Sequence, residues 1–211
     1  MPFGAHETME AHELLCEKIN RIAHFNLYAQ QARNPQLKEM INRHRQEAIR
    51  SYNEIVAYTH DYNAAPQMGM HQPMGGINPG QIQYGLHNPQ PVGPETNTTF
   101  SDQEIASAML ICHKNGAKNA MMGAVECADP HLRRMMMNSS VACADQAYET
   151  FLFMNQQGLY QVPTLNDHTA KTFMHAYQPM QQTQQMQQMQ QMQPMQQQIG
   201  NFGAGHTYGA M

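Results

Sequence analysis

Residues 129–135 read Asp-Pro-His-Leu-Arg-Arg-Met, and residues 34–40 read Asn-Pro-Gln-Leu-Lys-Glu-Met. In both runs an Asn or Asp that can cap a helix precedes a Pro, which suits the first helical position. Each run therefore predicts a helix that begins directly after a tight turn. The runs are 95 residues apart, and the same offset aligns Asn20 with Asn115 and Tyr58 with Phe153. The chain is predicted to contain an internal repeat.

Each copy of the repeat is predicted to be a helical hairpin. Apolar residues on both sides of each turn recur at the spacing of one helical face. The first hairpin is expected over 7–62. In the second, Ser101 and Glu104 form a capping-box pattern at the start, and Gly158 marks the end, so this hairpin is expected over 101–158.

The predicted core faces follow from this periodicity. In the first hairpin they consist of Ala11, Leu15, Ile19, Ile22 and Ala29, flanked by Leu14 and Phe25, and of Leu37, Ile41, His44, Ala48, Ile55 and Tyr62. In the second they consist of Ile105, Met109, Cys112, Gly116, Ala120, Gly123 and Cys127, and of Leu132, Met136, Ser139, Cys143, Ala147, Thr150 and Met154.

Two such hairpins predict an all-α, ferritin-like four-helix bundle with a long crossover. The expected organisation is a first hairpin in 1–62, a Pro- and Gly-rich crossover in 63–100, a second hairpin in 101–165 and a low-complexity tail in 166–211. The crossover is expected to drape over the bundle without folding. Residues 178–198 hold 13 Gln and 5 Met, a composition typical of disorder.

Composition narrows the classes of partner. The net charge is −4, and only 13% of the residues are charged. No basic patch indicates nucleic-acid binding, and no apolar run is long enough for a membrane span. No phosphate loop or nucleophile constellation is present, so we expect no catalytic residues, no cofactor and no enzyme activity.

Three stretches of the second hairpin resemble the spore coat protein F (CotF-like) domain. They are residues 100–106 (Phe-Ser-Asp-Gln-Glu-Ile-Ala), 128–133 (Ala-Asp-Pro-His-Leu-Arg) and 153–163 (Phe-Met-Asn-Gln-Gln-Gly-Leu-Tyr-Gln-Val-Pro). The last resembles the ending MNQRGWY-x-VP of that domain, with Leu159 in place of an aromatic residue. The resemblance covers about residues 100–165 well and residues 7–62 more loosely.

This resemblance implies a ferritin-like bundle with a structural role in the bacterial endospore coat. The protein would be synthesised in the mother-cell cytoplasm and would associate with other spore coat proteins, or with copies of itself. Glutamine side chains of the tail are candidate acyl donors for Gln–Lys cross-linking. The alternative is a metal-handling protein that binds copper or iron, in which the methionines of the tail are soft ligands for Cu(I).

A di-iron site is not expected, because the Glu-x-x-His pattern that such a site needs does not occur in the chain. His44 lies on a predicted core face. It is either a metal ligand with Glu47 or His12, or a core histidine bonded to Asn26 or a tyrosine hydroxyl, and the second interpretation is favoured. No metal site is therefore predicted.

The four cysteines, Cys16, Cys112, Cys127 and Cys143, are predicted on or near core faces. They are interpreted as buried free thiols, with oxidation during coat maturation as the alternative. Gly116, Ala120 and Gly123 are expected to let two helices of the bundle approach closely, with a groove for a partner as the alternative.

Overall fold

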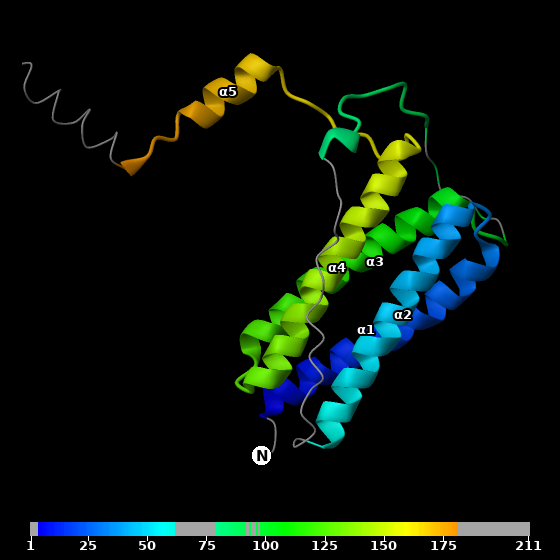
Figure 1. The fold of residues 1–211 in the computed structure, drawn as a ribbon, viewed down its shortest axis with the longest axis vertical. Coiled ribbons are helices and arrows are strands. Elements are labelled where there is room, and N and C mark those ends of the chain that lie inside the picture. Colours follow the sequence, from blue (N-terminus) through cyan, green and yellow to red (C-terminus); the bar gives the residue numbers. More distant parts are fainter. Residues whose placement is uncertain (1–3, 62–78, 92, 94–95, 97, 181–211) are drawn as a thin grey trace, which may run out of the picture. The chain divides into compact units, whose positions relative to one another are not determined.

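The computed structural model describes residues 4–61, 79–91, 93, 96 and 98–180. In these ranges the ordered elements are helical, which confirms the all-α prediction (Figure 1). The elements are α1 (Ala5–Gln31), α2 (Pro35–His60), the short 3-10 turn η1 (Pro79–Gln81), α3 (Asp102–Glu126), α4 (Pro130–Gln156) and α5 (Asp167–His175).

The chain divides into two compact units, Met1–Pro163 and Thr164–Met211. The first contains the helices α1–α4, with α1 beside α2 and α3 beside α4 as two hairpins (Figure 1). The second contains α5, none of whose residues is buried. None of the helices that the structure describes has an apolar stretch that could span a bilayer. The Gln- and Met-rich stretch 181–198 lies outside the described residues.

The predicted caps start three of the helices. Asn34 accepts hydrogen bonds from the backbone N–H groups of Gln36 and Leu37, and Asp129 caps α4 in the same way. Ser101 and Glu104 form the expected capping box at the start of α3. These side chains satisfy backbone donors that the first turn of a helix leaves without partners.

Each hairpin also caps the turn of the other. The Asp102 carboxylate accepts the backbone N–H groups of Arg33 and Asn34 at 2.8 and 3.0 Å. The Glu7 carboxylate accepts the backbone N–H of Asp129. Glu7 and Asp102 are equivalent at the offset of 95 residues, as are Asn34 and Asp129. The two hairpins are therefore related by an approximate two-fold axis.

The core faces of α2, α3 and α4 largely agree with the prediction, and α1 does not. Every predicted core residue of α4 is buried, whereas Tyr62 lies outside the described residues. On α1, Ile19 is 53% exposed, and the buried stripe runs through Leu14 and Phe25. Between these two lie Lys18 and Arg21, which are 2% and 4% exposed. The prediction was wrong here because it was built from apolar residues alone and included neither cation.

Candidate functional site

Four polar side chains meet in the centre of the bundle as two pairs. Lys18 on α1 donates a hydrogen bond to Ser139 on α4 at 3.1 Å. Nδ1 of His44 on α2 lies 3.1 Å from Nε2 of His113 on α3. All four are at most 4% exposed. At the offset of 95 residues, Lys18 is equivalent to His113, and His44 is equivalent to Ser139. The two-fold axis thus relates one polar pair to the other.

The histidine pair continues to Glu149 on α4. Its Oε2 lies 2.9 Å from His44 Nε2, and its other oxygen accepts from Arg43. A carboxylate only accepts, so neutral His44 carries its proton on Nε2, and its Nδ1 then accepts from His113 Nε2–H. Nδ1 of His113 is then a bare acceptor, and no described residue bonds to it. Both histidines are neutral in this arrangement.

The pKa values of these groups agree with that reading. Burial lowers the pKa of His44, and it lowers the pKa of His113 further because His44 and Arg21 add to the effect. Burial opposes ionisation of Glu149, but hydrogen bonds from His44 and Arg43 outweigh it and lower its pKa to about 2. The series of hydrogen bonds therefore joins an ionised carboxylate, that of Glu149, to two neutral imidazoles, those of His44 and His113.

Arg21 crosses from α1 to the second hairpin. Its Nη1 lies 3.0 Å from Cys143 Sγ, and its Nη2 donates to Glu17 at 2.6 Å. A Cβ on Gly116 would lie 2.2 Å from Nη2, so the glycine makes room for the guanidinium. Arg21 and Gly116 are themselves equivalent in the repeat. Residues related by a two-fold axis touch each other only close to that axis. There the large Arg21 side chain fits because its counterpart, Gly116, has no side chain.

His44 is buried, as the favoured interpretation expected, but the partners proposed for it were wrong. Among the described residues no hydrogen bond joins it to His12 or Glu47, and Asn26 accepts from Arg45 instead. Its partners are His113 and Glu149. The periodicity placed His113 beside the core face and not in it, so this residue was missed. The repeat did indicate that the core contains polar side chains, since His44 and Ser139 are equivalent and both lie on predicted core faces.

The cysteines differ in their surroundings. Cys127 and Cys143 are buried and Cys112 is half-buried, whereas Cys16 is exposed, contrary to the prediction for that residue. All four are free thiols. Burial raises the pKa of Cys112, and burial with nearby carboxylates raises the pKa of Cys127 to about 11. Both groups are therefore poor nucleophiles at neutral pH.

Within the part of the chain that the structure describes, no group of three or more His, Cys, Asp or Glu side chains is arranged to hold a metal ion. The thioether ligands considered for Cu(I) fall in 186–195, outside the described residues. The bundle itself therefore offers no observation that favours the metal-handling alternative.

The closing motif of the second hairpin holds part of the crossover. The Asn155 side chain, 2% exposed, accepts from Gln83 N and donates to the carbonyl oxygens of Gln83 and Tyr160. Gly85 N donates to Val162 O at 2.9 Å. The crossover is thus held at Gln83 by the Asn155 amide, at Gly85 by Val162 and at His87 by Gln161, although no fold was expected there.

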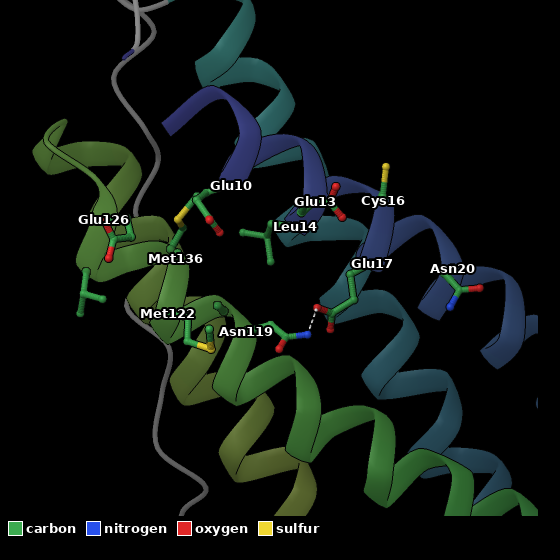
Figure 2. Close-up of a pocket in the computed structure, with 13 residues that line it drawn as sticks. Glu10, Glu13, Leu14, Cys16, Glu17, Asn20, Asn119, Met122, Glu126 and Met136 are labelled. Carbon is green, nitrogen blue, oxygen red and sulfur yellow. Dashed lines mark hydrogen bonds between the residues drawn. The ribbon is translucent and has the colours of Figure 1, made fainter. Parts of the chain in front are cut away.

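A groove lies between α1 and α3, with carboxylates around an apolar floor (Figure 2). Its volume is about 630 Å³. Glu17 on α1 and Asn119 on α3 are joined across it at 3.2 Å. The other main lining residues are Glu10, Glu13, Leu14, Asn20, Met122, Gly123, Val125, Glu126 and Met136.

Gly123 on α3 leaves room for side chains that line the groove. A Cβ on Gly123 would lie 3.0 Å from a carboxylate oxygen of Glu10 and 3.2 Å from Met136 Sδ. The close approach of helices predicted for Gly116, Ala120 and Gly123 stays a prediction, because the space beside both glycines holds side chains of α1 and α4. On the outer side, Met122 and Val125 are 67% and 65% exposed. The groove therefore presents both apolar and acidic side chains to solvent.

Comparisons with known proteins agree on one class. Residues 101–163 match the Coat F domain family. The chain is 26% identical over 179 residues to the spore coat protein F-like protein YhcQ of Bacillus subtilis (strain 168), covering 84% of this chain and 82% of that protein. A solved structure of a protein assigned to the spore coat of Bacillus halodurans C-125 superposes on this chain with a TM-score of 0.59. The two sequences are 13% identical, and the match covers 79% of this chain and 97% of that chain. The last likeness concerns the fold.

Proposed function

We propose that this chain, a spore coat protein of the coat F-like family, is a structural component of the bacterial endospore coat that acts by associating with other coat proteins. The observation that carries the proposal is the Coat F domain over 101–163. The proposal assigns no catalytic activity to the chain.

The architecture supports a structural role. The centre of the bundle is filled by paired polar side chains that bond to one another, and the histidine chain ends on a carboxylate held by Arg43. The features left open to solvent are surfaces, namely the groove between α1 and α3 and the apolar side chains of α5. Exposed apolar side chains near charged ones are typical of association surfaces.

Fractionation of spores tests the coat assignment. We expect the protein, followed with an antibody, in the coat fraction that is extracted by detergent and reductant from purified spores. Recovery of the protein only from the cytosol of vegetative cells would contradict the proposal.

Cross-linking is a second, separable part of the proposal. We propose that glutamines of residues 178–198 donate acyl groups to lysines of other coat proteins, with release of ammonia. Digestion of mature coat followed by mass spectrometry would reveal Gln–Lys isopeptides from this tail. Complete recovery of the tail as unmodified peptides would contradict cross-linking and leave the coat assignment intact.

A further inference from the structure

The groove between α1 and α3 has a counterpart at the other end of the bundle, and that counterpart is filled. Gly123 in the groove is equivalent to Tyr28 at the offset of 95 residues. The Tyr28 ring packs against Phe25 at 6.1 Å and meets Phe100, from the end of the crossover, edge-on at 5.8 Å. The described residues therefore cover one of the two equivalent places and leave the other open.

The two places also differ in charge. Glu10, Glu13 and Glu17 of the groove are equivalent to Ile105, Ala108 and Cys112, so carboxylates stand where the other end has apolar side chains. An aromatic side chain that suits the filled end does not suit these carboxylates, because burying them without a cation is costly.

These carboxylates are poorly neutralised by the chain. Glu17 is paired with Arg21 at 2.6 Å, and Glu126 lies 3.9 Å from His6. Glu10 and Glu13 form no ion pair with another described residue. Four carboxylates thus face one guanidinium and one histidine across a single groove, and mutual repulsion among them favours a cationic occupant.

The spacing of the lining residues indicates the shape of that occupant. Glu10, Glu13, Glu17 and Asn20 follow one another at three- and four-residue intervals along α1, which is one helical face about three turns long. Met122 and Val125 form the apolar side on α3. A helix that lies along the groove can place basic side chains at the same intervals on one edge and apolar side chains on the other.

We infer that the groove between α1 and α3 docks a basic, amphipathic helical segment of another coat protein. This inference rests on the proposed function and adds to it the chemistry of the partner. Lysine or arginine side chains of the segment pair with Glu10 and Glu13, and its apolar side chains cover Met122, Val125 and the floor at Leu14 and Gly123.

A synthetic amphipathic peptide of about 14 residues, with lysine and leucine at helical spacing, tests the site on the full chain. We expect it to bind the wild-type protein in fluorescence anisotropy and the same peptide with glutamate for lysine not to bind. The double variant E10Q/E13Q is expected to weaken binding at least about 10-fold, because it removes two of the groove carboxylates.

Two matched controls separate the groove from general attraction to an acidic protein. The variant E39Q/E47Q removes the same charge from α2 and is expected to change binding less than about 2-fold. On α3, M122K is expected to weaken binding about 10-fold, and I111K, which adds the same charge at an exposed site off the groove, is not. Equal losses for the members of either pair would overturn the inference.

Light scattering and spore fractionation cover the other outcomes. Wild-type protein that is a dimer, and that becomes monomeric on M122K, would show a second copy in the groove and overturn the assignment to another protein. In spores, we expect M122K to be extracted from the coat more readily than I111K. Equal extraction of both from the coat contradicts the docking site, whereas absence of wild-type protein from the coat contradicts the proposed function.

Discussion

Lys18 donates a hydrogen bond of 3.1 Å to Ser139, and the residues equivalent to them in the repeat, His113 and His44, are joined at the same distance. Each pair links one hairpin to the other. A buried polar atom that loses its partner costs about 1–3 kcal/mol. A shift of one hairpin along the other separates both pairs together, so we expect these pairs to fix the register of the two hairpins.

Replacing Lys18 with methionine is expected to stabilise the bundle at neutral pH. Burial lowers the pKa of Lys18 to about 8, against 10.5 for the free side chain. Below pH 8 the fold carries the cost of a buried ammonium, on the order of 3 kcal/mol. K18M removes that cost, so its free energy of unfolding at pH 7 in urea denaturation should exceed that of the wild type by roughly 1–3 kcal/mol.

The pH dependence supplies the internal control for K18M. Between pH 8 and 10.5 the unfolded wild type holds a proton on Lys18 that the folded protein does not. Wild-type stability should therefore gain from this residue as the pH rises through that range, and the advantage of K18M should shrink. An advantage that is independent of pH would contradict a buried ammonium.

The bundle is expected to lose stability in mild acid because of His44 and His113. Their pKa values are lowered in the fold, whereas an unfolded histidine has a pKa of about 6.5. As the pH falls below that value, the unfolded state takes up protons that the fold does not. Each histidine then contributes a slope of up to about 1.4 kcal/mol per pH unit, measurable by urea denaturation at pH 7, 6 and 5.

The variant H113L tests which groups produce that slope. It removes the more strongly shifted histidine and leaves His44 bonded to Glu149. The loss of stability between pH 6.5 and 5 should become about half as steep. An unchanged slope would mean that other groups cause the acid sensitivity.

The turns and the apolar faces of α2 and α4 were predictable because local chemistry determines them. Asn34 and Asp129 cap the helices that follow them whatever the rest of the chain does. The face of α1 was not predictable from hydrophobicity, since Lys18 and Arg21 enter the core only because Ser139, Cys143 and Gly116 of the other hairpin receive them.

The groove and the hydrogen bonds of Asn155 to the crossover were also missed, because they too depend on contacts between distant parts of the chain. Glu10, Glu13 and Glu17 lie off the apolar face predicted for their helix, and the neighbouring residues of α3 complete the groove that they line. Asn155, Val162 and Gln161 bond to the backbone of Gln83, Gly85 and His87 respectively, so no side-chain pattern in residues 83–87 signals the contact.

Adding a methyl group at Gly116 is expected to destabilise the bundle more than adding one at Gly123. At Gly116 the new Cβ would lie 2.2 Å from Arg21 Nη2 and 2.7 Å from Glu17 Oε1, and Arg21 is enclosed on all sides. G116A should lower the free energy of unfolding by about 1–3 kcal/mol in spite of the better helix propensity of alanine.

G123A is the matched control on the same helix. Its Cβ would lie 3.0 Å from the Glu10 carboxylate, which borders the open groove and can move away. Its effect in the same urea denaturation should stay within about 1 kcal/mol of the wild type. Equal destabilisation by both variants would show that Arg21 does not limit the space at Gly116.

Asn155→Ala is expected to release the crossover without unfolding the bundle. The substitution removes the three hydrogen bonds that join Asn155 to Gln83 and Tyr160. Amide hydrogen exchange over residues 83–87 should become at least about 10-fold faster, because each lost bond is worth roughly 1 kcal/mol. Exchange in the middle of α2 and α4 should not change, since those helices are held by the polar pairs and the apolar core.

Two further variants show which atoms of Asn155 hold the segment. N155D keeps an acceptor for Gln83 N but sets a buried carboxylate oxygen against the carbonyl oxygens of Gln83 and Tyr160, so its exchange over 83–87 should be at least as fast as that of N155A. Q156A, next to it on the exposed side of α4, should match the wild type. Faster exchange throughout α4 in N155A would mean that Asn155 supports the helix itself. Unchanged exchange over residues 83–87 would mean that Gln161 and Val162 hold the segment without Asn155.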